Sequence, residues 1–147
     1  KGQDIGSFIE KYQNEDFSEF RGASIAIRQG RFNETRYMVT KIGSNLPVYF
    51  VIYNEFKDSI EKINKSLLQK EKINDYFTDE EIKNLINNFR RYDFGLLGVD
   101  NEGNVLINPF EINSPAILLR VSKQTGEKEI RKGYVFKHYK GNWYIRK

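Results

Sequence analysis

The chain has 147 residues, of which 39% are hydrophobic and 14% aromatic, and its formal net charge is +4. This length and apolar content suit a folded chain and exclude a disordered one. The absence of cysteine excludes disulfide scaffolds, thiolate zinc sites and cysteine nucleophiles. No apolar run reaches the ~18 residues of a membrane-spanning helix. We therefore expect residues 1–147 to form a soluble, single globular domain.

The first residue is Lys1, so the sequence opens without a methionine or a signal peptide. A start this close to the first expected helix fits an exported protein that has lost its signal, and it equally fits a trimmed chain. We favour an exported protein, periplasmic or surface-attached, over a cytoplasmic one. The lack of cysteine does not decide the compartment.

The first third of the chain predicts one helix and three strands. Residues 25–27 alternate apolar and polar side chains, and residues 35–42 read as the hairpin partner of that strand. Residues 48–53 are apolar on both faces, which predicts a central strand covered on both sides. The first helix, which Asp4 or Ser7 can cap, is predicted by apolar residues at helical spacing: Ile5, Phe8, Ile9 and Tyr12.

Two helices are expected in the middle of the chain. The first is predicted by a four-three-four apolar spacing: Phe56, Ile60, Ile63 and Leu67. The second begins with a capping box, in which Thr78 is followed three residues later by Glu81. Its buried stripe is expected to consist of four apolar residues: Ile82, Leu85, Ile86 and Phe89.

The last third predicts strands only. Residues 94–99 and 105–107 form a hairpin, and residues 116–121 form a further strand. A turn at residues 125–126 leads into one strand that ends near Tyr139, and a last strand contains Trp143. The fold class is therefore α+β, a mainly antiparallel sheet with an N-terminal helix and two central helices packed on it.

Motifs for catalysis are missing from the sequence. It contains no nucleophile elbow, no Walker phosphate loop and no dinucleotide-binding glycine pattern. His138 is the only histidine, so a zinc site with several histidines is excluded. We expect His138 to be structural, because no nucleophile or carboxylate partner for it can be identified. No catalytic residue, cofactor or metal ligand is nominated.

The C-terminal segment is basic and aromatic. From Arg120 to Lys147, nine basic residues stand against Glu127 and Glu129, with aromatic residues between them. A protein that binds single-stranded nucleic acid uses basic side chains for the phosphates and aromatic rings for the bases. A solvated sheet face with lysines outside and aromatic residues in the core gives the same sequence pattern. The candidate polyanion-binding residues are Lys123, Lys128, Arg131, Lys132, Lys137 and Lys140.

The sequence leaves three functions open. We favour a non-catalytic binding or accessory domain that recognises a protein or another macromolecule through its sheet or loops. A nucleic-acid or polyanion binder that uses the basic C-terminal strands is the alternative. A hydrolase that depends on two carboxylates is the third, although no pair of Asp or Glu residues can be nominated for it.

Overall fold

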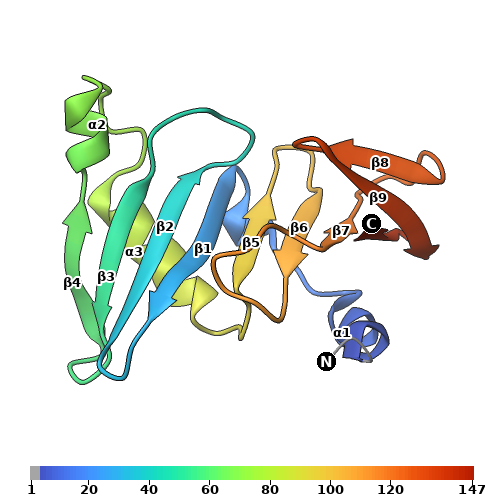
Figure 1. The fold of residues 1–147 in the computed structure, drawn as a ribbon, viewed down its shortest axis with the longest axis horizontal. Coiled ribbons are helices and arrows are strands. Elements are labelled where there is room, and N and C mark those ends of the chain that lie inside the picture. The colour runs from blue at the N-terminus through green and yellow to red at the C-terminus, as the bar shows by residue number, and fades with distance from the viewer. Residues whose placement is uncertain (1–3) are drawn as a thin grey trace.

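One long sheet forms the body of the protein (Figure 1). The computed structural model describes residues 4–147, and its strands pair in the order β4-β3-β2-β1-β5-β6-β7-β10-β9-β8, each antiparallel to its neighbours. The helices are α1 (Ile5–Tyr12), α2 (Ser66–Lys70) and α3 (Asp79–Phe89). The strands are β1 (Ala23–Gly30), β2 (Glu34–Lys41), β3 (Tyr49–Asn54), β4 (Ser59–Asn64), β5 (Leu96–Val99), β6 (Val105–Asn108), β7 (Leu118–Arg120), β8 (Lys128–Arg131), β9 (Tyr134–Lys140) and β10 (Trp143–Arg146). The α+β class with a mainly antiparallel sheet is as predicted.

Helix α3 begins at the predicted capping box. The Glu81 amide donates to the Thr78 hydroxyl oxygen at 3.0 Å, and the Thr78 amide donates to the Glu81 carboxylate at 2.7 Å. Both amides would otherwise lack a partner at the start of the helix. Three acidic side chains in the first turn also favour this end of the helix dipole. The start of α3 is therefore encoded locally.

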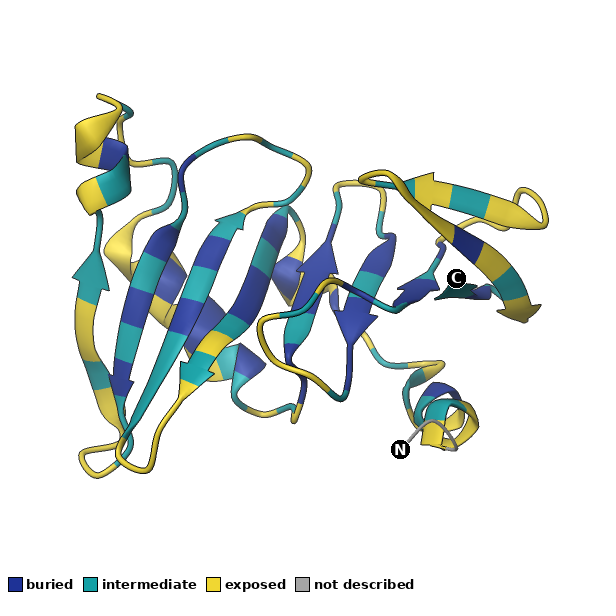
Figure 2. Cartoon of the chain, in the orientation of Figure 1, coloured by how far each residue is buried: buried dark blue, intermediate teal, exposed yellow. Residues whose placement is uncertain are grey.

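The apolar stripe of α3 faces the sheet. Figure 1 shows α3 crossing behind β1, β2 and β3. Its four apolar side chains, Ile82, Leu85, Ile86 and Phe89, are buried in the same core as the inward side chains of those strands. Figure 2 shows the alternation of buried and half-buried residues along these strands, which is expected for a sheet covered on one face.

The helix predicted from Phe56 to Leu67 is wrong. The segment forms the edge strand β4, followed by the short helix α2. The pairing register shifts by one residue, since Ile60 lies opposite Tyr53 whereas Ile63 lies opposite Val51. This bulge places two residues that are three apart on the same face of the strand. The spacing therefore imitates a helical stripe.

Strand β3 pairs on both sides, as predicted for a central strand, but the predicted cover on both of its faces is wrong. Strand β3 lies next to the edge strand β4, and its residues alternate between buried and half-buried. Tyr49 and Val51 point into the core under α3, whereas Phe50 and Ile52 lie on the opposite face. The guanidinium of Arg28 sits over the Phe50 ring at 4.9 Å. On the face opposite the core, a cation therefore covers the Phe50 ring, and no second apolar layer does.

The single strand predicted to end near Tyr139 is a hairpin of two strands, β8 and β9. The chain reverses at Lys132 and Gly133, which both have positive φ values, of 51° and 81°. Two successive residues with positive φ match the tight turn that suits the twist of antiparallel strands. Strand β10 then returns between β7 and β9.

Helix α1 forms where the sequence predicts it, although the Asp4 side chain makes no capping hydrogen bond. Its Phe8 ring packs 5.2 Å from Phe94 and 6.4 Å from Trp143. The buried Phe17 and Phe20 extend this aromatic cluster. Among residues 4–147, no helix is long and apolar enough to cross a membrane.

The C-terminal end of α3 is fixed to the sheet by Arg90. Its guanidinium donates to both Glu55 carboxylate oxygens, at 2.8 and 2.9 Å, and to the Tyr37 hydroxyl at 2.8 Å. It also stacks on the Tyr53 ring at 3.7 Å. The hydrogen bonds from Arg90, with a further one from Thr35, hold the pKa of Glu55 below its ordinary value. One side chain therefore joins α3 to β2 and β3.

We expect Thr78→Ala to lower the free energy of unfolding by about 1 kcal/mol, because the Glu81 amide loses its acceptor. Urea unfolding followed by circular dichroism measures the change. Thr78→Ser keeps the hydroxyl and is the matched control, with a smaller loss. Equal losses in the two variants would contradict the capping role.

We expect Glu55→Gln to destabilise the protein by about 1 to 3 kcal/mol at neutral pH, since it removes charge-assisted hydrogen bonds to Arg90. The folded-state pKa of Glu55 is lowered, so its contribution is present above the ordinary value of 4.5 and is lost as the pH falls through the folded-state pKa. The difference in unfolding free energy between wild type and Glu55→Gln should therefore shrink below pH 4.5. If the difference in unfolding free energy between the two proteins stays constant down to acid pH, the Glu55–Arg90 ion pair does not contribute as expected.

Candidate functional site

The two faces of the sheet differ in what covers them. One cross-strand row (Ile25, Leu97, Ile107 and Leu118) lies in the core on the face that α3 covers. The neighbouring row (Ser24, Gly98, Leu106, Leu119 and Tyr144) therefore points to the opposite face. The β8–β9 hairpin folds over that face, and a cleft lies between the hairpin and the strands β5 and β6.

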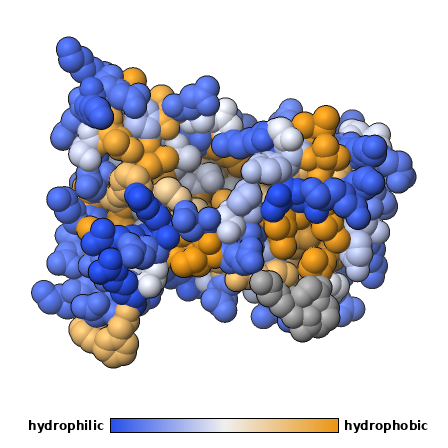
Figure 3. Space-filling model, in the orientation of Figure 1, coloured by the Kyte–Doolittle hydropathy of each residue, from blue (hydrophilic) through white to orange (hydrophobic). Residues whose placement is uncertain are grey.

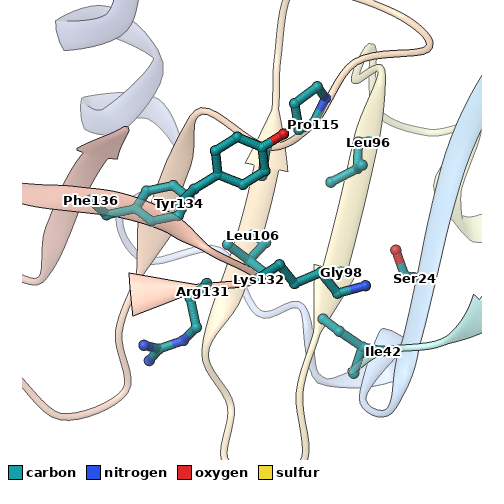
Figure 4. A pocket seen from close by; sticks show the side chains of 11 residues that line it. Ser24, Ile42, Leu96, Gly98, Leu106, Pro115, Arg131, Lys132, Tyr134 and Phe136 are labelled. Atoms are coloured by element: carbon teal, nitrogen blue, oxygen red, sulfur yellow. The ribbon is translucent and has the colours of Figure 1, made fainter. Parts of the chain in front are cut away.

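This space, the hairpin cleft, holds about 240 Å³. Its floor is apolar and comes from β5 and β6, with Leu96, Gly98 and Leu106. Its wall is the β8–β9 hairpin, with Tyr134 and Phe136, and Figure 4 shows Tyr134 extending toward Pro115. Ser24 of β1 and Ile42 close the far side. Figure 3 shows apolar side chains exposed over this part of the molecule.

The hairpin wall is held by a second, smaller core. Phe136 is buried with Leu119 and Tyr144, which lie beneath it on β7 and β10. Arg146 of β10 donates to the Ala116 carbonyl at 2.9 Å and lies 4.8 Å from the Tyr134 ring centroid. The hairpin is therefore held to the sheet through Phe136 and Tyr134, which lie two residues apart on the same face of β9.

The rim of the cleft is the loop of residues 109–117, which Asn108 shapes. The fully buried Asn108 side chain donates to the Pro115 carbonyl at 2.7 Å and accepts from the amides of Phe110 and Glu111, each at 3.1 Å. The loop passes so close to Gly95 that a Cβ there would lie 1.8 Å from the Glu111 carbonyl oxygen. Only glycine fits at this crossing.

The charge at the mouth of the cleft is positive. Figure 4 shows the Lys132 side chain extending across the cleft toward Ser24, whereas the Arg131 guanidinium points away. Arg131 pairs with Glu129 at 2.8 Å. The hydrogen bond from Thr125 and the pairing with Arg131 hold the pKa of Glu129 below its ordinary value. Within residues 4–147, Lys132 has no acidic partner, so its charge is available to a ligand.

The same face continues from the cleft onto β1–β4. Half-buried Phe50 and Ile52 lie there with Arg28, beside a second hollow of about 240 Å³. Lys62 lies directly opposite Ile52 on the edge strand β4. Arg36, on the same face, pairs with Glu34 at 2.5 Å. This stretch of sheet, the open face, is apolar along its middle and basic at its margins.

The six candidate polyanion-binding residues do not lie together. Arg131 and Lys132 line the hairpin cleft, and Lys123 lies in the loop after β7. Lys128 and Lys137 lie opposite each other across the hairpin, on the face turned away from the cleft, and Lys140 pairs opposite Trp143. The structure therefore separates the set onto two faces and a loop.

The aromatic residues of this segment are also divided. Phe136, Trp143 and Tyr144 are buried, whereas Tyr134 is 41% exposed and Tyr139 is 49% exposed. Tyr134 and Tyr139 are therefore partly exposed, although Tyr134 lines the cleft together with Phe136. The Tyr139 hydroxyl lies near helix α1, since a Cβ built at Gly6 would be 3.7 Å from it.

His138 lies at the end of β9 and bonds within its own turn. Its Nε2 lies 2.7 Å from the Gly141 carbonyl oxygen, so this nitrogen carries the proton and donates. Its ring packs edge-on against Tyr144 at 5.4 Å. These contacts position the β9–β10 turn.

Most of the cleft was missed by sequence reasoning, although Arg131 and Lys132 were among the nominated residues. The available signal was glycine inside strand-like segments, at Gly95 and Gly98. A glycine within a strand often marks a place where another backbone segment or a ligand approaches the strand closely. A Cβ at Gly98 would lie 2.7 Å from the end of the Ile42 side chain and 3.4 Å from the Ser24 hydroxyl.

Comparison of the chain with protein-family models, with curated protein sequences and with solved structures finds no match.

We expect Phe136→Ala to lower the free energy of unfolding by about 3 to 5 kcal/mol, because it empties the centre of the smaller core. Tyr134→Ala, at a partly exposed position on the same strand, is the control and should lower the free energy of unfolding by less. Urea unfolding of both variants makes the comparison. If Phe136→Ala unfolds like wild type, the hairpin is not held by this contact.

Proposed function

We propose that this protein is a non-catalytic binding domain that captures an extended segment of a partner protein across the open face, with one apolar side chain inserted into the hairpin cleft. The observation that carries the proposal is the preformed apolar cleft with Lys132 at its mouth. An apolar cleft with a few polar groups at its edge is the usual form of a recognition site.

The size of the cleft favours a side chain as its occupant over a whole small molecule. Its 240 Å³ lies below the ~300 to 1,000 Å³ of pockets that enclose drug-sized ligands. The apolar surface does not end at the cleft but continues over Phe50 and Ile52. A chain segment with apolar residues at intervals fits such a surface better than a compact ligand does.

The charges on this face favour an acidic partner. Arg28, Lys62 and Lys132 lie along it, while Glu34 and Glu129 are neutralised by Arg36 and Arg131. Complementary charge raises the rate and the specificity of association. The expected partner segment therefore alternates acidic and apolar side chains.

A labelled peptide that alternates Glu with Leu or Phe tests the proposal, with binding followed by fluorescence anisotropy and by amide chemical-shift changes. We expect saturable binding, with the shifts centred on Ser24, Leu106 and Lys132. Gly98→Ala narrows the cleft and Lys132→Glu reverses its charge, so each should weaken binding about tenfold or more. Lys123→Glu changes a loop charge outside the cleft and is the matched control.

Three outcomes would overturn the proposal. The first is absence of binding by the peptide. The second is peptide binding with shifts confined to Lys128, Lys137 and Tyr139, which would favour the polyanion alternative. The third is binding of a fatty acid such as dodecanoate in the cleft while the peptide does not bind, which would favour a carrier of small amphipathic molecules.

A further inference from the structure

Two phenylalanine side chains stand exposed at one end of the sheet. Phe32, in the β1–β2 turn, is 90% exposed, and Phe56, in the β3–β4 turn, is 70% exposed. Their rings contact each other edge-to-face with centroids 5.4 Å apart. Both turns lie at the lower left of Figure 1, and Figure 3 shows an apolar projection at that corner. We call these two rings the phenylalanine tip.

The phenylalanine tip is held in place by its turns. The Arg31 amide donates to the Glu34 carbonyl at 2.7 Å, which closes the first turn. The Asn54 side chain accepts from the Lys57 amide at 3.0 Å in the second. The Glu55 amide donates to the Asn33 carbonyl at 2.9 Å, so the two turns are joined.

The second turn is also anchored to the body of the protein. The Glu55 carboxylate, one residue before Phe56, accepts both hydrogen bonds from Arg90 at the end of α3. The exposed rings are therefore carried by a connected part of the fold and not by a free loop. Preorganised exposure of large apolar side chains marks an interaction site.

The charge around the phenylalanine tip is positive. Arg31 and Lys57 are exposed beside the two rings, and within residues 4–147 neither forms an ion pair. Of the nearby acids, Glu34 pairs with Arg36 and Glu55 pairs with Arg90. Asp58 accepts from the Tyr53 hydroxyl and keeps its charge, so in the described part of the chain two cations stand against one carboxylate without a cationic partner. The surface that meets this end of the molecule is therefore expected to be anionic.

We propose that the phenylalanine tip docks this protein on the surface of an anionic lipid bilayer. The two rings enter the boundary between headgroups and acyl chains, and Arg31 and Lys57 contact the lipid phosphates. The shape favours a membrane over a protein partner, because a projecting pair of rings needs a matching pocket in a protein and none in a bilayer. Apolar side chains combined with cations are the usual basis of such peripheral binding.

Co-sedimentation with phosphatidylglycerol–phosphatidylcholine vesicles, and with phosphatidylcholine vesicles alone, tests the proposal. We expect the wild type to bind the anionic vesicles and to be released by high salt. The double variant Phe32→Ser/Phe56→Ser should bind more weakly by about tenfold or more, as should Arg31→Glu/Lys57→Glu. Phe56→Trp should retain binding and place its indole within reach of quenchers attached to the lipid acyl chains.

Ile130→Ser is the matched control, because Ile130 is 67% exposed on the distant β8 strand and its loss should leave vesicle binding unchanged. Unfolding midpoints check that each variant is folded. Equal binding by the wild type and the double Ser variant would overturn the proposal, as would absence of binding to anionic vesicles. Self-association that the double Ser variant abolishes, without vesicle binding by the wild type, would instead assign the phenylalanine tip to a contact between copies of this chain.

Discussion

The burial of Phe136 against Leu119 and Tyr144 is the contact on which the hairpin cleft depends. An antiparallel sheet of this length has two faces, and α3 covers only one of them over β1, β2 and β3. On the opposite face, the apolar residues of β5–β7 and β10 need cover of their own. The chain provides it by folding the β8–β9 hairpin back over its own sheet.

The hairpin covers that face incompletely, and this is why a cleft exists. Phe136 reaches the smaller core, while Tyr134 stands further out and stacks with Arg146. Between Tyr134 and the floor, Gly98 contributes no side chain, and the 109–117 loop is held at the rim by Asn108. The cleft is thus a consequence of a hairpin fixed at its base, a glycine in the floor and a rigid rim.

The phenylalanine tip depends on a different contact. Arg90 holds Glu55, and the Glu55 amide holds the neighbouring turn through the Asn33 carbonyl. A half-buried ion pair with aromatic cover is less screened by solvent than a surface pair. The end of α3 therefore orders two hairpin turns that lie far from it in the sequence.

Elements whose signals are local could be predicted from the sequence. The capping box at Thr78 begins α3 by hydrogen bonds within four residues, and the turns before Val105 and Trp143 define their hairpins in the same way. Three predictions were wrong: the helix from Phe56 to Leu67, the cover on both faces of β3, and the single strand that ends near Tyr139. The bulge in β4 gives Ile60 and Ile63 a helical spacing, and positive φ at Lys132 splits one expected strand into two. Tertiary structure alone decided that Arg131 and Lys132 lie at a cleft while Lys128 and Lys137 face away, because strand pairing, and not sequence distance, sets which side chains share a face.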